Sequence, residues 1–243
     1  MESIQAALPA GDGVACFNRM YLQVTQDVDQ QVKQGSFGDP AFVSELDVVF
    51  ANLYFAAVDS LSGPPSGMPV AWAPLLTSRT NTDIEPIQFA LAGMNAHINH
   101  DLPIAVVSTC TELATAPTDG SHHADYQKVD ALLDTAEQSI REGFEPPDVR
   151  DVDLHVATVA DIVANWSIAA ARDVAWDTSV ALWDVRADQT ATQLLTDSLA
   201  RTVAMASRGL LVAVGSADDT SLLDRLLVKP AARLVGAARA VVR

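Results

Sequence analysis

The chain is poor in positively charged residues. Against 31 Asp and Glu it has 15 Lys and Arg, which gives a formal net charge of −16. Such an acidic protein repels phosphate backbones, so we expect no binding to nucleic acid. The balance reverses in residues 201–243, which carry seven basic and three acidic side chains. We expect this segment to pair with the acidic remainder, the alternative being contact with a membrane surface or a partner.

Cysteine and long apolar runs are also scarce. The two cysteines, Cys16 and Cys110, each lie in an apolar context, so we expect buried, inert thiols. No stretch reaches about 18 uninterrupted apolar residues, which predicts no membrane span. The start, MESIQAALPAGDG, has no basic region followed by a long apolar run, so no secretory signal is expected. These features together predict a cytoplasmic protein.

Several catalytic motifs are missing. The sequence contains no G-x-S-x-G, no P-loop, no G-x-G-x-x-G, no C-x-x-C and no H-E-x-x-H pattern. These absences argue against a serine triad, against nucleotide-phosphate binding and against dinucleotide chemistry.

What is abundant is small apolar residues with helical spacing. Ala, Val, Leu and other hydrophobic residues make up 49% of the chain and aromatics only 6%, which favours closely packed helices. We therefore predict a single all-α domain over residues 1–243, a multi-helix bundle. The segment GLLVAVGS could instead form a short strand. The expected helices are 14–33, 40–61, 71–78, 86–114, 122–144, 152–185, 190–207, 220–228 and 230–240.

Turn residues set the expected helix ends. Asp39 followed by Pro40 is typical of an N-cap and a first helical residue. Pro64, Pro65 and Pro69 are expected to end that helix. Pro103 should end or kink the helix of residues 86–114 just after Asp101.

The densest polar cluster lies in MNAHINHDLP. His97 precedes His100 by three residues and Asp101 by four, so all three can point from one helical face into a cavity, with Asn95 nearby but off that face. A His–Asp pair at this spacing suits a divalent metal or a general base oriented by a carboxylate. The structural alternative is a buried hydrogen bond that joins helices. So many polar groups together favour a cavity wall, because burying them unsatisfied is costly.

Four other positions complete the candidate site. His123 can face the first cluster as a catalytic residue, while the adjacent His122 is expected to be solvated. Trp176 and Arg172 can line a substrate-binding wall, and Asp47 stands among apolar neighbours, as a substrate contact or as a partner for Arg172. The structural alternatives are a capping loop for His123, a core position for Trp176 and a buried ion pair for Asp47.

Four segments resemble an uncharacterised family of bacterial helical proteins. They are LDVVFANLYF, IQFALAGMNAHINHDLP, HADYQKVDALL and ARDVAWDTSVALW. A more distant resemblance is to the zinc-dependent phospholipase C and P1 nuclease class, whose H-x-x-x-D pair on a central helix is matched by His97, Asp101 and Pro103. This resemblance implies a phospholipase C-like outline, with His97 and Asp101 as metal ligands. The class needs a three-metal cluster, however, and this chain has five histidines in all, so at most one ion held by His97, Asp101, His123 and Asp47 is expected.

Three functions follow from this pattern. The first is a metal-free, cofactor-free cyclase or isomerase that acts on a hydrophobic, polyketide-like intermediate, with His97, Asp101 and His123 as catalytic residues and Asn95, His100, Trp176, Arg172 and Asp47 as substrate contacts. The second is a metal-dependent phosphoesterase of the phospholipase C type. The third is a non-catalytic protein that binds a hydrophobic ligand. A hydrophobic small molecule is the expected partner in the first and third cases, and a homodimer is one arrangement considered.

Overall fold

All regular elements that the structure describes are helices. This computed structural model describes residues 1–129, 133 and 167–212. Over these ranges no strand occurs, so the all-α prediction is confirmed. Residues 122–129 are also helical, and residues 60–62 and 65–67 form short 3-10 turns. The remaining helices are α1 (Glu2–Ala7), α2 (Gly13–Lys33), α3 (Pro40–Asp59), α4 (Ala73–Ser78), α5 (Pro86–Ala96), the π-helix η3 (His97–Asp101), α6 (Leu102–Glu112), α9 (Ile168–Val185) and α10 (Gln189–Leu210).

Side-chain caps explain where several of these helices begin. The Asp39 carboxylate accepts a hydrogen bond from the Phe42 amide at 3.0 Å, and Pro40 follows as the first residue of α3. This confirms the predicted start, in which the cap satisfies an amide that has no partner inside the helix. At α5, Glu85 and Gln88 form a reciprocal capping box.

The helix of residues 86–114 was predicted to end or kink just after Asp101, and it does not end there. Instead the chain widens into η3 directly before the proline, and the Leu102 amide donates to the His97 carbonyl. Proline lacks an amide proton, and its ring clashes with the carbonyl of the residue four positions before it. A π turn at this point removes the clash, so that α6 continues α5 with a local change of hydrogen-bond register.

The predicted helix of residues 152–185 is also wrong in its start. Ser167 has extended backbone angles, and its side chain caps a new helix by accepting from the Ala170 amide. Residues 152–166 lie outside the described residues, as do the helices predicted for 220–228 and 230–240. Of the candidate strand GLLVAVGS, Gly209 and Leu210 belong to α10.

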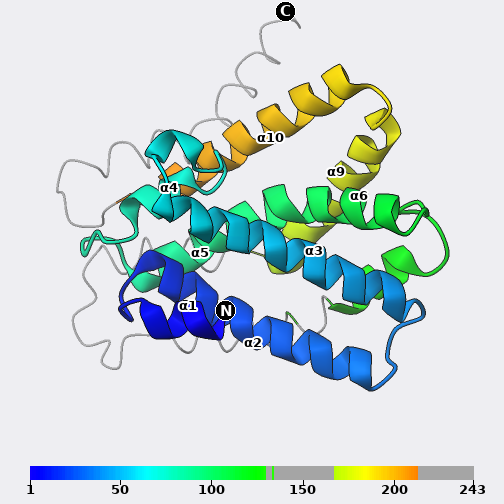
Figure 1. The fold of residues 1–243 in the computed structure, drawn as a ribbon, viewed down its shortest axis with the longest axis horizontal. Helices are drawn as coiled ribbons and strands as arrows, with labels where there is room; N and C mark the ends of the chain where they lie inside the picture. The colour runs from blue at the N-terminus through cyan, green and yellow to red at the C-terminus, as the bar shows by residue number, and fades with distance from the viewer. Residues whose placement is uncertain (130–132, 134–166, 213–243) are drawn as a thin grey trace, which may run out of the picture. The chain divides into compact units, whose positions relative to one another are not determined.

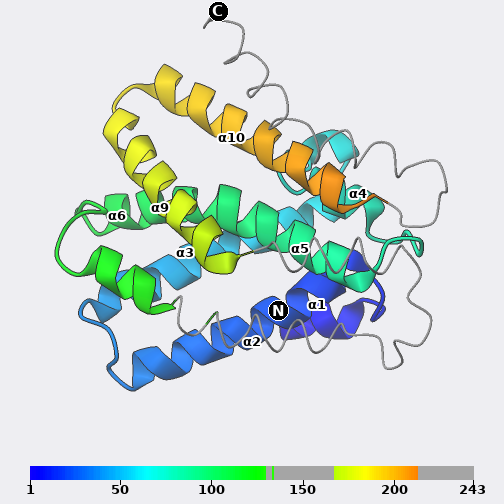
Figure 2. The ribbon, with the colours of Figure 1, turned by 180° about the vertical axis from the view of Figure 1, so that it is seen from behind.

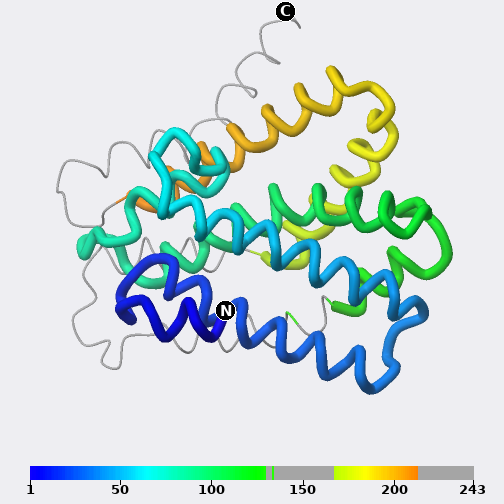
Figure 3. Tube along the Cα trace, in the orientation of Figure 1, coloured from blue at the N-terminus to red at the C-terminus, as the bar shows by residue number. Residues whose placement is uncertain are grey.

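Helices α5 and α6 run through the middle of the unit formed by Met1–Val212. Helix α5 packs against α2 and α10, and Figures 1 and 2 show these two on opposite sides of it. Helix α6 packs against α3 and α9. The tube in Figure 3 shows the chain reversing after α2, so that α3 runs back beside it. The prediction of one domain over the whole chain stays a prediction.

Helix α3 is long and apolar. By length and composition alone, residues Pro40–Ser62 are long and apolar enough to cross a membrane. In the apolar stretch of this segment, 28% of the residues are buried. Core helices of soluble proteins pass the same test, so this is weak evidence. The expectation of no membrane span therefore stays a prediction.

Small residues bring α2 and α5 close together. Gly93 of α5 lies directly against the Phe17 ring of α2, where a Cβ atom would overlap the ring.

Both cysteines are buried with free thiols, as predicted. Burial raises the pKa of Cys110 to about 12, which makes this thiol a poor nucleophile.

We expect Gly93→Ala to lower the free energy of unfolding by about 1–3 kcal/mol, because the added methyl group forces Phe17 away from its packing position. The matched control is Gly209→Ala in α10, where nothing lies within 4 Å of the position that the methyl group would take. The free energy of unfolding of that variant should be unchanged or higher by up to about 1 kcal/mol. Urea unfolding followed by circular dichroism measures both, and equal effects would contradict the close contact.

Candidate functional site

A cavity lies between α2, α3, η3 and the helix of residues 122–129. About 90 Å³ of it is open to the centre of a water-sized molecule, within about 840 Å³ of atom-free space that includes open solvent, and its wall is mostly apolar. The polar and charged residues on the wall are Tyr21, Asp47, His97, Asp125, Tyr126 and Arg172.

The Asp101 carboxylate is buried beside this cavity and accepts three hydrogen bonds. Its Oδ2 atom accepts from Trp72 Nε1 at 2.8 Å and from His97 Nδ1 at 3.0 Å, and its Oδ1 atom accepts from His100 Nδ1 at 2.7 Å. Burial by itself raises the pKa of Asp101, but the bonds from His100 and His97 outweigh it, and the pKa lies below its usual value. Asp101 is therefore an ionised acceptor at neutral pH.

His97 is the partner of Asp101 that reaches the cavity wall. Burial lowers its pKa, against the opposing effect of Asp101, so the ring is neutral at neutral pH. Because the carboxylate only accepts, the proton of the neutral ring lies on Nδ1, and Nε2 is left as an acceptor. Nε2 is buried and has no hydrogen-bond partner among the described residues. This leaves a bare basic nitrogen at the cavity wall.

Aromatic rings hold His97 in place. The Phe50 ring stacks on it with centroids 3.5 Å apart, and the Tyr21 ring lies edge-on at 4.4 Å. The Tyr21 hydroxyl is also buried without a partner; Thr25 is near enough to affect its pKa, but forms no well-aligned hydrogen bond. Burial, with the negative charges of Asp47 and Asp101, raises the pKa of Tyr21 well above its usual value, so it stays a neutral phenol.

Asp47 lies on the cavity wall and is half-buried. Burial raises its pKa to about 6, and the negative charge of Asp29 acts in the same direction. No hydrogen bond or ion pair joins it to a described residue, so it is not the partner of Arg172 that was considered. Arg172 instead donates to the Tyr126 carbonyl at 2.8 Å, among other contacts, and its guanidinium lies 4.0 Å from the centre of the Tyr126 ring.

Three other predicted site residues lie elsewhere. Asn95 donates to the Val203 carbonyl and to Ser207, both at 2.9 Å, and so joins α5 to α10 away from the cavity. The rings of His123 and Trp176 stack on each other at 4.6 Å. His123 is exposed, and neither ring lines the cavity.

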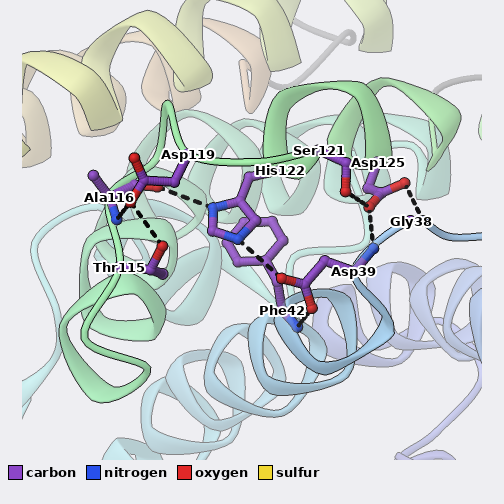
Figure 4. A network of polar contacts seen from close by, with 9 residues as sticks. All are labelled: Gly38, Asp39, Phe42, Thr115, Ala116, Asp119, Ser121, His122 and Asp125. Atoms are coloured by element: carbon purple, nitrogen blue, oxygen red, sulfur yellow. Dashed lines mark hydrogen bonds and ion pairs between the residues drawn. The ribbon is translucent and has the colours of Figure 1, made fainter.

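The adjacent His122, expected in solvent, is buried instead, and that prediction is wrong. It stacks on Phe42 at 4.0 Å, and its nitrogens contact the Ala116 carbonyl at 2.9 Å and Asp39 Oδ2 at 3.2 Å (Figure 4). Neighbouring helical residues point about 100° apart, so only one of the two histidines can face inward. The turn before α3, which contains Asp39, lies on the side of His122, so His122 is the one that is buried.

Asp125 fastens the same end of the cavity. Its carboxylate accepts from the Gly38 and Asp39 amides at 2.8 and 2.7 Å, from Ser121 at 2.7 Å and from Lys128 at 2.9 Å. Figure 4 shows it reaching from the helix of residues 122–129 to the turn before α3. Burial raises the pKa of Asp125, but these bonds outweigh it, and the pKa lies well below its usual value.

Of the residues considered for a metal, His97 and Asp101 are bonded to each other, but His123 lies elsewhere. His123 is exposed and stacks on Trp176. Across residues 1–129, 133 and 167–212, no group of three or more His, Cys, Asp or Glu side chains is placed to hold a metal ion. The described residues thus offer acid–base groups rather than a ligand set.

Comparison with known proteins gives one match. A model of the family of unknown function DUF5995 matches residues 1–213. The chain belongs to this family. No curated protein and no solved structure was found to match. The uncharacterised family predicted from the sequence is therefore supported, whereas the resemblance to phospholipase C and P1 nuclease receives no support.

Three residues of this site were not foreseen. Trp72 stands in a short segment with no link in sequence to Asp101, and only the fold brings them together. Tyr21 and Phe50 read as ordinary core aromatics. Their one sequence signal is spacing: Tyr21 follows Phe17 by four residues and Phe50 follows Asp47 by three, which places each pair on one helical face.

We expect His97 to be neutral at neutral pH with its proton on Nδ1, because Asp101 accepts that proton in a hydrogen bond. Heteronuclear NMR of the imidazole nitrogens should show this tautomer. In Asp101→Asn the preference should weaken, since the amide oxygen is a poorer acceptor. A protonated ring, or a proton on Nε2, would contradict this description of the site.

The pKa of Asp125 is lower in the folded than in the unfolded protein, so its contribution to stability is present above the unfolded value, about 4, and is lost as the pH falls. At neutral pH we expect Asp125→Asn to lower the free energy of unfolding by about 2–4 kcal/mol. The difference between wild type and variant should shrink below about pH 4. Urea unfolding between about pH 7 and pH 3 measures it, and a constant difference would contradict the assignment.

Proposed function

We propose that the cavity binds an apolar small molecule and that His97 acts on it as a general base, in a metal-free reaction of the isomerase or cyclase type. The observation that carries the proposal is His97 Nε2, a buried nitrogen without a hydrogen-bond partner among the described residues, on a side chain that lines an apolar cavity. Bases of this kind are most effective where water is excluded.

Asp101 supports this role in two ways. Its bond to Nδ1 selects the tautomer that leaves Nε2 free to accept a proton. When Nε2 takes up a proton, the imidazolium forms next to an ionised carboxylate, which stabilises the buried positive charge. Trp72 and His100 hold the carboxylate in position, so Asp101 need not reorient during the reaction.

Two further groups on the wall complete an acid–base set. Asp47, with a pKa of about 6, exchanges protons readily near neutral pH and can return the proton that His97 removes. The neutral Tyr21 hydroxyl can donate a hydrogen bond to an oxygen that gains negative charge. His97, Asp47 and Tyr21 come from η3, α3 and α2 respectively.

Phe50 covers one face of the His97 ring. Nε2 has less than 1 Å² of exposed surface, and the Phe50 ring stacks directly on the imidazole. Phe50 lines the cavity and is itself half-buried. We propose that a bound molecule displaces this ring and takes its place against His97.

A hydrophobic substrate, such as a polyketide-like intermediate, suits the apolar wall. A phosphoester does not, because the chain is strongly acidic and His123 lies apart from the other residues considered for a metal. The remaining alternative is a carrier that binds such a molecule without turnover. Its support is that the wall is largely apolar and that Nε2 is covered.

The test uses 5-nitrobenzisoxazole, a small apolar probe. A base removes its C3 proton, the N–O bond breaks, and the coloured 2-cyano-4-nitrophenolate forms. We expect the wild-type protein to accelerate this elimination at least ~10-fold more than the His97→Phe variant, towards the lower end of general-base effects. Phe50→Ala should increase the rate further, because it opens space beside the His97 ring. Absorbance of the product measures each rate.

The matched control is His123→Phe, the same substitution at an exposed histidine that can keep its stack on Trp176. It should react like the wild type. Circular dichroism shows whether each variant is folded. Equal rates in wild type and His97→Phe, with Phe50 present or replaced by Ala, would overturn the catalytic proposal. Binding of the probe without His97-dependent turnover would instead identify a carrier.

A further inference from the structure

Two buried polar atoms have no well-aligned hydrogen-bond partner among the described residues, and both belong to side chains that line the cavity. They are Tyr21 Oη from α2 and His97 Nε2 from η3, and each exposes less than 1 Å² of surface, so a ligand reaches them only by displacing a neighbouring side chain. The centroids of the two rings are 4.4 Å apart. Leaving such an atom unsatisfied costs about 1–3 kcal/mol, so a pair of them on a cavity wall points to a partner supplied from the cavity.

The chemistry of the two atoms restricts that partner. Nε2 of the neutral ring only accepts a hydrogen bond, so its partner must donate. The Tyr21 hydroxyl can donate, and then its partner must accept. A hydroxyl group does both with one oxygen atom, whereas a carbonyl or carboxylate only accepts and an ammonium group only donates.

The charges around the two atoms argue against an anionic partner. Asp47 lines the same cavity, and Asp101 is bonded to the other ring nitrogen of His97, Nδ1. The negative charges of both carboxylates raise the pKa of Tyr21. Arg172 and Asp125 also line the cavity, but Arg172 is bonded to the Tyr126 carbonyl and Asp125 to two backbone amides. A neutral polar group therefore fits this part of the wall best.

We propose that the ligand of this cavity is an apolar molecule with a hydroxyl group that donates to His97 Nε2 and accepts from Tyr21 Oη. This inference rests on the proposed function and names its substrate class. The hydroxyl is then the group whose proton faces the base. The rest of the molecule lies against the apolar side chains of α2 and α3.

The experiment compares 2-naphthol with naphthalene, which have the same ring system and differ in one hydroxyl. Equilibrium dialysis should show that the wild-type protein binds 2-naphthol about tenfold more tightly, as expected for two modest hydrogen bonds. Tyr21→Phe and His97→Phe should each lose most of this preference while still binding naphthalene. Equal affinities of the wild-type protein for both compounds would overturn the proposal.

Fluorescence gives an independent readout. Excited 2-naphthol is a strong acid, and its deprotonated form emits at longer wavelength when a base accepts the proton. Bound to the wild-type protein, it should show this emission, and bound to His97→Phe it should emit as the neutral form. Neutral emission from both would contradict contact with Nε2.

Thr109→Val is the matched control for Tyr21→Phe. Thr109 also has a buried hydroxyl without a partner among the described residues, but it does not line the cavity. Its replacement should leave the preference for 2-naphthol unchanged, and loss of the preference in this variant would contradict the assignment. Because 5-nitrobenzisoxazole has no hydroxyl, its His97-dependent elimination can succeed while 2-naphthol fails, so the two proposals fail separately.

Discussion

The buried Asp101 carboxylate is the constraint on which the site depends. A negative charge away from water is tolerated only when hydrogen bonds surround it, and here donors from Trp72, His97 and His100 do so. Trp72 precedes α4, whereas the histidines belong to η3. The carboxylate thus ties two separate parts of the chain together and fixes which nitrogen of His97 remains open.

Around this centre, the cavity combines a rigid inner wall with a fastened end. The inner wall carries His97 and Tyr21, set among aromatic rings that leave them little freedom. At the far end, Asp125 bonds the helix of residues 122–129 to the turn before α3. Such an arrangement would hold the groups of the proposed reaction in place before a ligand binds, as proton transfer in a dry site requires.

Features that depend on neighbouring residues could be predicted from the sequence, and features that depend on packing could not. The start of α3 at Asp39 and Pro40 and the closeness of His97 to Asp101 follow from local spacing. Which of His122 and His123 is buried depends on where another helix lies. The sequence predicted His123 inside and His122 in solvent, and the structure shows the reverse. The bond from Trp72 to Asp101 spans 29 residues and has no local signal. At Pro103 the sequence predicted an end or a kink of the helix, but not the π turn that accommodates the proline.

The π turn also fixes the rotation of α6 about its axis relative to α5. Returning its hydrogen bonds to the α pattern would remove one residue from the turn and rotate α6 by about 100° relative to α5. Helix α5 is bonded to α10 through Asn95, and α6 packs against α9, so neither can rotate freely. The direction of the His97 imidazole is therefore set by the packing of the helices on both sides of the π turn, together with its bond to Asp101.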